Sequence, residues 1–457
     1  MSTTKPYQGP NRDSLLVVGL GATGLSVARY LHAKGLDFAI VDSREEPPGL
    51  PRLREEIPEV RAYCGNAAQT ALKGAMDLLV SPGVSLSEPW VREAMEGGAR
   101  VRGDIDLFAE AAGAPIVGIT GSNAKSTVTA WLGEMAAKAG RRAGVGGNIG
   151  TPALDTLSPN NELYVTELSS FQLERAGDLD LAVATVLNLT PDHLDRHGNF
   201  RAYRRAKHRI FAAARCVVFN ADDESTIPAN VGSVPSFSWR YGVPVGEEFG
   251  LREDSDAVWI AQGRALLLPV SELSLAGRHN IANALAALCL GSAIQLSRDA
   301  MLEALCSFSG LPHRCELVAD CRGIRWINDS KATNIGASLA AIEGLGQDKN
   351  LILIAGGEGK GAAFADLAAP VAKHCKAVLL IGAAAEELAR EMRGSSSVEI
   401  SETLERAVSR ARELAGSGDT VLLSPACASF DQFANYGARG DVFRRLVLEF
   451  AVGEGAA

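Results

Sequence analysis

The sequence lacks the features that mark secreted, membrane and nucleic-acid-binding proteins. No apolar run approaches the roughly 20 residues that cross a membrane, and the first 14 residues, MSTTKPYQGPNRDS, have no apolar signal-peptide stretch. No Lys/Arg block dominates a segment, and 45 basic against 54 acidic side chains give a net charge of −9. This balance disfavours nucleic acid as the main partner. We therefore expect a cytoplasmic protein with no nucleic-acid or membrane partner.

Paired cysteines are missing as well. The eight cysteines are scattered without a CxxC pair, so neither a zinc site nor a disulfide framework is indicated, and we expect buried, reduced thiols. A content of 47% hydrophobic and 22% charged residues indicates a globular chain. Because domains of roughly 100 to 200 residues are typical, the length of 457 residues predicts two or three of them.

One segment predicts a phosphate-binding loop. A strand pattern at 115–118 leads into GITGSNAKST (118–127), and a helical pattern follows at 128–139. Such a loop offers backbone N–H groups to an anion, while Lys125 reaches the terminal phosphates and Ser126 offers a hydroxyl to Mg²⁺. The strict pattern has glycine directly before the lysine, where this chain has Ala124. The order of elements favours ATP or GTP binding over a surface loop rich in small residues.

The N-terminal part carries a second glycine pattern. The segment GLGATG (19–24) follows an apolar strand, a helix extends to about residue 34, and a second strand ends at Asp42. This is the dinucleotide-binding fingerprint, with an acid where a ribose hydroxyl is met. A later strand at 76–80 leads into the turn SPGV (81–84), at the strand end where doubly wound sheets bind ligands. Nucleotide binding is favoured, and tight packing without a ligand is the alternative.

The order of elements predicts three α/β blocks. The Ala/Gly-rich stretch 109–115 indicates a linker, and 309–314 a second boundary. The second block contains strands at 164–167 and 183–188 and is expected to have a mostly parallel sheet, and the third is a further doubly wound unit. The other predicted elements are hairpin strands at 257–261 and 264–268, a helix at 280–294, and strands at 324–327, 350–355, 377–381 and 420–423.

Two further positions suit a metal or phosphate site, and a third, Lys207, does not by its local pattern. Glu167 ends a predicted strand, where an acidic ligand to the nucleotide's Mg²⁺ is expected; a carboxylate that starts a helix is the alternative. The loop NLTPDHLDR (188–196) places His193 among aspartates at another strand end, which fits either a metal or phosphate role or a structural histidine. Lys207 lies in a basic helical segment that by itself predicts a solvated face.

Together these segments resemble the Mur ligase family over essentially the whole chain. The chain is similar to that family at VVGLGATGLS, SPG, GITGSNAKST, GGNIG, ELSSFQLE, DHLDRH, AKHRIF, GRHNIANALAA, HRCE, NDSKATN, GGEGKG and SPACASFDQFANYGARG. Their number and common order make coincidence an inadequate explanation. The segments SKATN and PACASFDQF resemble those of members that add D-glutamate.

The resemblance implies a fold, a reaction and its cofactors. The α/β fold would comprise a Rossmann-like UDP-substrate-binding domain at 1–105, a central P-loop ATP-binding domain at 106–311 and a Rossmann-like amino-acid-binding domain at 312–457. The reaction would add D-glutamate to UDP-N-acetylmuramoyl-L-alanine through an acyl phosphate made with ATP, in peptidoglycan precursor synthesis. Two Mg²⁺ ions and a carbamylated lysine at Lys207 would serve it, in a chain that we expect to be a monomer.

The resemblance also implies the residues of each site. The catalytic residues would be Lys125, Glu167, His193 and Lys207, and those near the metal ions Ser126, Glu167, His193 and Lys207. ATP would contact Gly121, Ser122, Asn123, Ala124, Lys125, Ser126, Thr127, Asn280, Asn283, Arg314, Asp329 and Lys331. The UDP substrate would contact Ala22, Thr23, Asp42, Ser43, Arg44, Gly83, Asn148 and His193. D-glutamate would contact Thr333, Lys360, Ser429, Phe430 and Tyr436.

The chain departs from the family pattern at Ala124, where glycine is usual. If this residue needs a positive φ, alanine costs on the order of 1 kcal/mol and loosens the loop, whereas a right-handed conformation makes it harmless. His197 stands where tyrosine is common and Tyr436 where phenylalanine is common. We expect both to tune substrate contacts without removing a role.

Four other functions compete with this interpretation. A Mur ligase for another amino acid would share most of the motifs. Folylpolyglutamate synthetases share the last two domains, but their phosphate loop lies near the N-terminus, whereas a GxGxxG domain precedes it here. A nicotinamide dehydrogenase would explain the first glycine pattern and leave the ATP loop unused. A catalytically silent UDP-sugar-binding protein would explain binding but not the metal-site residues.

Overall fold

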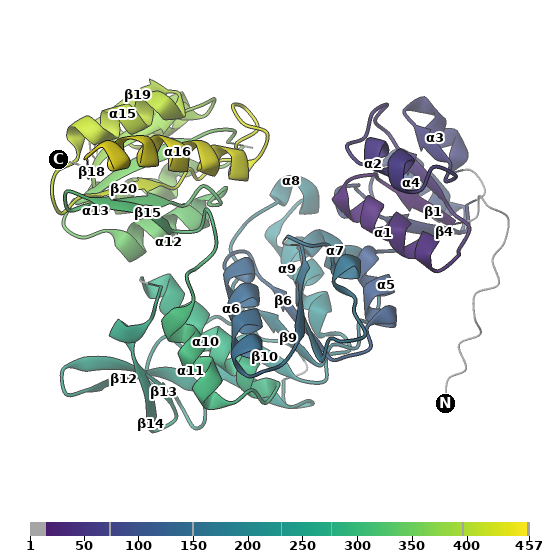
Figure 1. The fold of residues 1–457 in the computed structure, drawn as a ribbon, viewed down its shortest axis with the longest axis horizontal. Coiled ribbons are helices and arrows are strands. Elements are labelled where there is room, and N and C mark those ends of the chain that lie inside the picture. The colour runs from purple at the N-terminus through teal and green to yellow at the C-terminus, as the bar shows by residue number, and fades with distance from the viewer. Residues whose placement is uncertain are drawn as a thin grey trace. The chain divides into compact units, whose positions relative to one another are not determined.

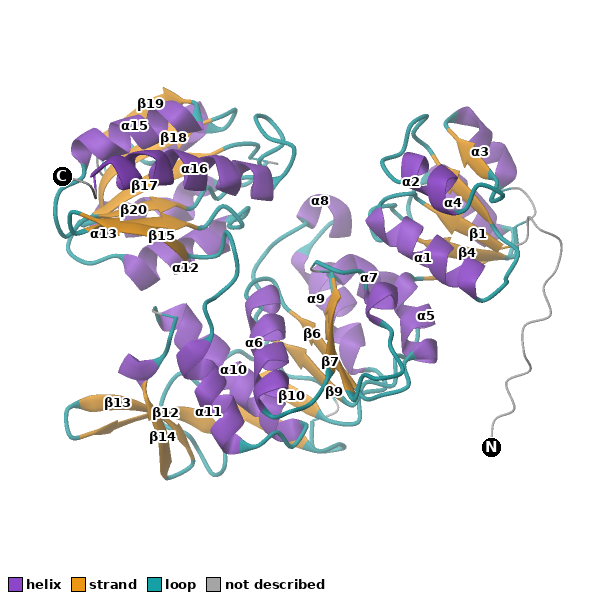
Figure 2. Cartoon of the chain, in the orientation of Figure 1, coloured by secondary structure: helices purple, strands orange, loops and turns teal. Residues whose placement is uncertain are grey.

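The computed structural model of the chain describes residues 15–454 except 73, 74, 149, 230, 276, 360, 395 and 396. The chain divides into two compact units, one of 1–267 with 285–304 and one of 268–284 with 305–457. Within the described residues, the first unit holds two sheets and the second unit one, and helices flank each sheet (Figures 1 and 2). Three largely parallel α/β sheets confirm the predicted fold class.

The N-terminal sheet has five parallel strands. Its elements are β1 (Leu15–Val18), α1 (Ala22–Ala33), β2 (Ala39–Asp42), α2 (Leu50–Glu56), β3 (Ala62–Cys64), α3 (Asn66–Ala71), β4 (Asp77–Val80), α4 (Pro89–Glu96), β5 (Arg100–Arg102) and α5 (Asp104–Ala111). The strand order is β3-β2-β1-β4-β5. Residues of α3 and α4 pack on one face, and those of α1, α2 and α5 on the other. Strands β1, β2 and β4 are wholly buried, as expected of a parallel sheet covered on both faces.

The glycines between β1 and α1 have a steric role. A Cβ at Gly24 would lie 1.9 Å from the carbonyl oxygen of Gly19, so only glycine lets the helix approach the strand this closely. Gly19 has φ +93°, and a Cβ there would meet Val84 at 2.9 Å. The predicted strand, helix and strand ending at Asp42 are confirmed.

The central sheet has nine strands and carries the phosphate loop. Its elements are β6 (Ile116–Thr120), α6 (Lys125–Lys138), β7 (Ala143–Gly147), η1 (Ala153–Thr156), β8 (Leu163–Glu167), α7 (Ser170–Arg175), β9 (Val183–Val186), α8 (Leu194–His197), α9 (Phe200–His208), η2 (Arg209–Phe211), β10 (Val217–Asn220), β11 (Ser236–Trp239), β12 (Phe249–Asp254), β13 (Ala257–Gln262), β14 (Ala265–Pro269), η3 (Val270–Glu272), α10 (Arg278–Ala293) and α11 (Arg298–Ser307). The order is β14-β13-β12-β11-β10-β9-β6-β8-β7. In this order, every neighbouring pair from β12 through β6 to β7 is parallel, whereas β12 and β13 are antiparallel.

The C-terminal sheet has six strands. Its elements are β15 (Glu316–Cys321), β16 (Ile324–Asn328), α12 (Ile335–Leu345), β17 (Leu351–Gly356), η4 (Phe364–Leu367), α13 (Ala368–His374), β18 (Cys375–Ile381), α14 (Ala385–Glu391), β19 (Ser397–Glu402), α15 (Leu404–Leu414), β20 (Thr420–Leu423) and α16 (Tyr436–Glu454). The order is β15-β16-β20-β17-β18-β19, antiparallel only between β15 and β16. One core cluster joins the sheet to α12–α14 and a second joins it to α15 and α16, so helices cover both faces (Figure 1).

Three local expectations were wrong. Helix α6 begins at Lys125 rather than near residue 128, because the loop turns directly into the helix. Residues 109–111 end helix α5 rather than form a linker, since Ala109 packs against the core. The thiols are free as expected, but Cys306 is exposed and the buried ones are Cys216, Cys289, Cys375 and Cys427. Among the described helices, none has both the length and the apolarity to cross a membrane.

Candidate functional site

Three strand ends meet at the predicted phosphate loop. Strand β6 lies between β8 and β9, with Ile119 opposite Glu167 in the parallel ladder. The N–H of Leu168 donates to the carbonyl oxygen of Ile119 at 2.8 Å, and that of Leu187 donates to the carbonyl of Thr120 at 2.9 Å. Because the carboxyl ends of parallel strands share one edge, the loops after β6, β8 and β9 lie together there.

Ala124 has a left-handed backbone, with φ +66° and ψ −9°, directly before α6. A residue with a Cβ is disfavoured in this conformation by about 1–2 kcal/mol. The position therefore has the positive φ that favours the family's glycine, and alanine is strained there. Lys125 is the first residue of α6, so the unbonded N–H groups of the first helical turn face the loop, as anion binding requires.

Side chains from the loop after β9 hold the phosphate loop in place. The Asn188 side chain accepts the N–H of Asn123 at 2.8 Å and donates to its carbonyl at 3.2 Å. The Ser122 hydroxyl bonds to the backbone of Thr190 and lies 3.0 Å from the Tyr203 hydroxyl. Sequence reasoning missed Asn188 and Tyr203. The available signals were a polar residue after an apolar strand, and the spacing of four between Tyr203 and Lys207.

Two lysines share one acceptor at the loop. Lys125 Nζ donates to the carbonyls of Gly121 and Ser122 at 2.9 Å each, and Lys207 Nζ donates to the same Gly121 carbonyl at 2.8 Å. Lys207 is only 2% exposed, which corrects the solvated face predicted from its helix. The buried stripe of α9 includes Tyr203 and Lys207. Burial, followed by the charge of Lys125, lowers the pKa of Lys207 well below its ordinary value.

Glu167 is buried at the end of β8, 2% exposed. Its Oε1 accepts the side-chain N–H of Asn148 at 2.7 Å, and its carbonyl accepts the backbone N–H of Asn148 at 2.9 Å. A Cβ at Gly147, which has φ +107°, would lie 2.3 Å from the Glu167 carbonyl, so glycine allows this approach. A residue predicted for the UDP substrate thus contacts one predicted for the metal.

His193 lies in a left-handed conformation, φ +52°, at the start of α8. Its side chain is 43% exposed, and Nε2 is 3.7 Å from an Asp192 carboxylate oxygen. The imidazole packs edge-on to Phe171, with ring centroids 4.9 Å apart, and Phe171 belongs to α7, the helix that follows β8. The loops after β8 and β9 are therefore joined through ring contacts beside the phosphate loop.

In the N-terminal sheet, Asp42 is engaged by the glycine loop. Its carboxylate accepts the N–H of Leu20 at 2.7 Å and both backbone and side-chain bonds from Arg44 at 2.7–2.9 Å. Burial would raise the Asp42 pKa, but these bonds outweigh it and lower the pKa. Ala22, Ser43, Arg44 and Gly83 are exposed and Thr23 is half-buried, so this edge of the sheet is open to a ligand.

In the second unit, Asp329 follows β16 and bonds to the end of β20. Its carboxylate accepts the Ser424 hydroxyl at 2.8 Å and the N–H of Cys315 at 3.2 Å. Burial raises the Asp329 pKa to about 6, although these bonds and the charge of Arg314 act to lower it. The Lys331 ammonium lies 3.7 Å from the ring centroid of Tyr436, a cation–π contact.

The other predicted residues of this unit differ in exposure. Ser429 is buried and Phe430 is 64% exposed, whereas Thr333 and Arg314 are half-buried. Asn280 and Asn283 are buried and bonded to each other at 3.1 Å. Lys360 lies outside the described residues.

Arg439, which sequence reasoning missed, holds the loops of this unit together. It is 1% exposed and donates to the Ser330 hydroxyl and carbonyl and to the carbonyls of Cys427 and Ala428, at 2.8–3.3 Å. These acceptors lie just past β16 and β20, beside Lys331 and Ser429. Burial lowers its pKa to about 10, so the guanidinium stays charged at neutral pH. The family segment that ends in YGARG was the available signal.

The donor set fits Mg²⁺ held jointly with phosphates. Among the described residues there is no group of three His, Cys, Asp or Glu side chains placed to hold a metal ion. Glu167 and Ser126 supply a buried carboxylate and a buried hydroxyl, which are oxygen ligands suited to Mg²⁺. Mg²⁺ commonly takes one or two protein ligands together with substrate phosphates and water. The site therefore resembles a nucleotide-dependent Mg²⁺ site rather than an all-protein cage.

The fold and site define an ATP-dependent enzyme with a phosphate loop and an adjacent acidic strand end. Models of the Mur ligase middle domain, the Mur ligase MurD-like N-terminal domain and the Mur ligase glutamate ligase domain match residues 119–291, 13–103 and 313–427. The chain belongs to the Mur ligase family.

Full-length relatives support the same assignment. A Pseudomonas aeruginosa protein named UDP-N-acetylmuramoylalanine--D-glutamate ligase is 52% identical over 95% of this chain and 98% of its own. A Marinobacter nauticus protein of the same name is 50% identical over 94% and 97%. The fold is similar to that of a UDP-N-acetylmuramate-alanine ligase from Thermotoga maritima, with a TM-score of 0.61 and 18% identity over 96% of this chain and 99% of that one. The predicted family and ligase class are confirmed.

Proposed function

We propose that this chain joins D-glutamate to UDP-N-acetylmuramoyl-L-alanine at the expense of ATP, in peptidoglycan precursor synthesis. Relatives of about half-identical sequence along nearly the whole chain bear the name of this activity. The observation that carries the proposal is the phosphate loop with Lys125 and Lys207 on one carbonyl and Glu167 on the neighbouring strand. A silent UDP-sugar-binding protein or a dehydrogenase would have no use for this arrangement.

The chemistry requires activation of a carboxylate. An oxygen of the L-alanine carboxylate attacks the γ-phosphorus of ATP and ADP leaves, giving an acyl phosphate. The amine of D-glutamate then attacks the acyl carbon, loses a proton, and expels phosphate that carries the former carboxylate oxygen. Lys125 and the N–H groups at the start of α6 offset the negative charge during both steps. The protein contributes positioning and electrostatics, and no side-chain nucleophile is needed.

We propose two Mg²⁺ ions, held by Ser126 and Glu167 in one case and by His193 and a modified Lys207 in the other. Bound Mg²⁺ neutralises charge on the phosphate and carboxylate oxygens. Glu167 is oriented for this role by the 2.7 Å bond from Asn148. His193 is exposed enough to reach a ligand.

We propose that Lys207 carries a carbamate. The Lys207 and Lys125 ammonium groups repel each other at the shared Gly121 carbonyl, and burial further favours the neutral amine, which is the form that reacts with CO₂. The carbamate replaces a cation with an anion, so repulsion of Lys125 becomes attraction and a metal ligand is gained. The carbamate N–H can keep the bond to Gly121.

The carbamate predicts a spectroscopic and a chemical result. Enzyme equilibrated with ¹³C-bicarbonate should give a carbamate carbonyl signal that Lys207→Ala abolishes. That variant should lose activity, and short carboxylic acids should partly restore it by supplying the missing carboxylate. Full turnover by Lys207→Ala, or no carbamate signal in the wild type, would exclude the modification.

The remaining assignments complete the proposal. The domains would be 1–105, 106–311 and 312–457, for the UDP substrate, ATP and D-glutamate respectively. The UDP substrate would contact the exposed edge around Asp42 and Gly83, and D-glutamate the loops around Ser429 and Tyr436. We propose a cytoplasmic location, since two of the three substrates are nucleotides and all eight cysteines are free. We also propose that the chain acts as a monomer, which light scattering would test.

An isotope experiment tests the reaction course. UDP-N-acetylmuramoyl-L-alanine labelled with ¹⁸O in its carboxylate should transfer one label to the released phosphate for each amide formed. Unlabelled phosphate would exclude attack of the carboxylate on ATP.

A further inference from the structure

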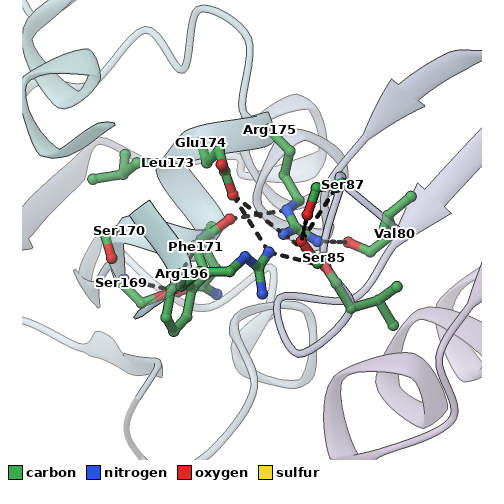
Figure 3. Close-up of polar contacts among 12 residues, drawn as sticks. Val80, Ser85, Ser87, Ser169, Ser170, Phe171, Leu173, Glu174, Arg175 and Arg196 are labelled. Carbon is green, nitrogen blue, oxygen red and sulfur yellow. Dashed lines mark hydrogen bonds and ion pairs between the residues drawn. The ribbon is translucent and has the colours of Figure 1, made fainter. Parts of the chain in front are cut away.

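A buried arginine links the two sheets of the first unit. Arg175 ends α7, and its side chain is fully buried. Its guanidinium donates to the carbonyls of Val80, Ser81 and Val84 at 3.0, 2.5 and 3.2 Å (Figure 3). All three acceptors lie in or beside the loop 81–84, which follows β4 in the N-terminal sheet. The helix that donates follows β8 in the central sheet.

A second arginine reaches the same loop. Arg196, in α8, donates to the Val84 carbonyl at 3.1 Å and lies 3.4 Å from a Glu174 carboxylate oxygen. Its guanidinium also lies 4.9 Å from the ring centroid of Phe171. Figure 3 shows Glu174, Arg175 and Arg196 close together, beside Val80 and Ser85, the residues that flank this loop. The loop is thus held by the helix after Glu167 and by the helix after His193.

The opposite side of the loop is fixed by the glycine-rich segment. The Ser81 hydroxyl donates to the Gly19 carbonyl at 2.9 Å, and the Ser81 N–H donates to the Val18 carbonyl at 2.8 Å. A Cβ at Gly19 would collide with Val84. The loop therefore has little freedom to move while the arginines are in place.

The charge of Arg175 is stabilised mainly by backbone carbonyl groups rather than by a carboxylate. A Glu174 carboxylate oxygen lies 3.8 Å from the guanidinium, beyond hydrogen-bonding distance, whereas four carbonyls, including that of Phe171 at 2.9 Å, accept its N–H groups. Burial and then Arg196 lower its pKa to about 10, so it stays charged at neutral pH. A neutral replacement would leave several buried carbonyls without their donor, and the loop would have to move to find water.

We propose that Arg175 is a positioning residue for the UDP substrate, because it fixes the loop 81–84 to helix α7, which follows Glu167 in the chain. This inference rests on the proposed function, in which Gly83 contacts the nucleotide sugar. The clamp keeps the bound substrate's carboxylate aligned with the phosphate loop. Arg196 supports it through Val84.

The test compares Arg175→Met and Arg175→Lys with a matched control. Arg209 also donates from its guanidinium to carbonyls near α7, those of Leu173 and Ala176, but both acceptors belong to the central domain. Arg209→Met therefore removes a similar contact without touching the loop. Calorimetric titration with UDP-N-acetylmuramoyl-L-alanine and, separately, with a non-hydrolysable ATP analogue measures each Kd, and hydrogen exchange of the peptide covering 81–87 reports loop mobility.

We expect Arg175→Met to raise the Kd for the UDP substrate at least about tenfold, a change of about 1.4 kcal/mol, with the ATP-analogue Kd within about twofold. KM for the UDP substrate should rise more than kcat falls, and exchange at 81–87 should accelerate. Arg175→Lys should be intermediate, and Arg209→Met should leave both affinities unchanged. Equal loss of both affinities, or an unchanged UDP-substrate Kd, would overturn the positioning role. Failure of the wild type itself to bind the UDP substrate would instead overturn the proposed function.

Discussion

The residue that most sharply separates this phosphate loop from the usual pattern is Ala124. Its φ of +66° strains alanine, so Ala124→Gly should stabilise the folded chain by about 0.5–1 kcal/mol, after allowance for the extra freedom of glycine in the unfolded chain. Urea unfolding followed by circular dichroism measures the change. Ala139→Gly, at the other end of α6 where φ is −77°, is the control and should not stabilise. A loss of stability in Ala124→Gly would contradict the strain.

A second residue-scale prediction concerns Asp104, whose pKa burial raises to about 6, although Gln172 donates to it at 3.1 Å. The unfolded value is about 3.9, so between these values the folded chain holds a proton that the unfolded chain has released. The stability from this proton is present below about pH 4 and is lost as the pH rises through about 6.

Asp104→Asn removes this pH-dependent cost. The variant should be more stable than the wild type at pH 8, by on the order of 2–3 kcal/mol, and nearly equal to it at pH 4. Asp180→Asn is the control, and its effect on stability should vary with pH in the opposite direction. The reason is that the hydrogen bond from Arg215 lowers the pKa of that exposed carboxyl. Urea unfolding at both pH values measures the free energy of unfolding of each variant. A stability difference between Asp104→Asn and the wild type that does not vary with pH would refute the cost of a buried charge at Asp104.

At the scale of elements, Arg439 makes the loops after β16 and β20 one structure. Arg439→Met should raise KM for D-glutamate at least about tenfold while the Kd of the UDP substrate stays within about twofold, because the lost donors serve only loops of the second unit. Arg445→Met on the same helix removes only an exposed ion pair with Glu449 and should leave both constants unchanged. Steady-state kinetics with varied D-glutamate, together with calorimetric titration of the UDP substrate, checks this. An unchanged KM would mean that the loops hold their shape without Arg439.

Elements with a clear pattern could be predicted from the sequence. Apolar strands before glycine-rich turns, such as β1 and β6, lie where their pattern placed them, and β20 covers the predicted residues 420–423. The end of α5 could not be predicted, because alanine and glycine are typical of both linkers and helix ends. The burial of Lys207 was also beyond the local pattern. Its basic neighbours suggested exposure to solvent, and only the packing of α9 against α7 and the phosphate loop decides which side of the helix is covered.

Contacts between distant segments were hardest to predict. The motifs identified Glu167, Asn148 and the phosphate loop separately, and the sheet order brings them to one edge. Arg175 had no such signal, and Arg439 had only its place in a family segment, since a buried arginine that binds carbonyls has the same sequence appearance as an exposed one. Their roles depend on which strand ends become neighbours, which is a property of the tertiary fold.

At the scale of the whole molecule, the predicted site residues come from both compact units. The phosphate loop, Glu167 and Lys207 belong to the first, and Asp329, Lys331 and Ser429 to the second. Each unit has a buried arginine that binds carbonyls of loops at its strand ends. In the proposed assignment, the complete reaction uses residues from both units, and the residues proposed for D-glutamate belong to the second.

The central claim is tested most directly by phosphate release from ATP with Mg²⁺ and UDP-N-acetylmuramoyl-L-alanine. D-glutamate should be compared with L-glutamate, with L-lysine and with no amino acid. The account predicts release that requires D-glutamate, with a matching amount of the dipeptide product seen by mass spectrometry. Release with another amino acid instead, or no release despite binding of both nucleotides, would contradict it.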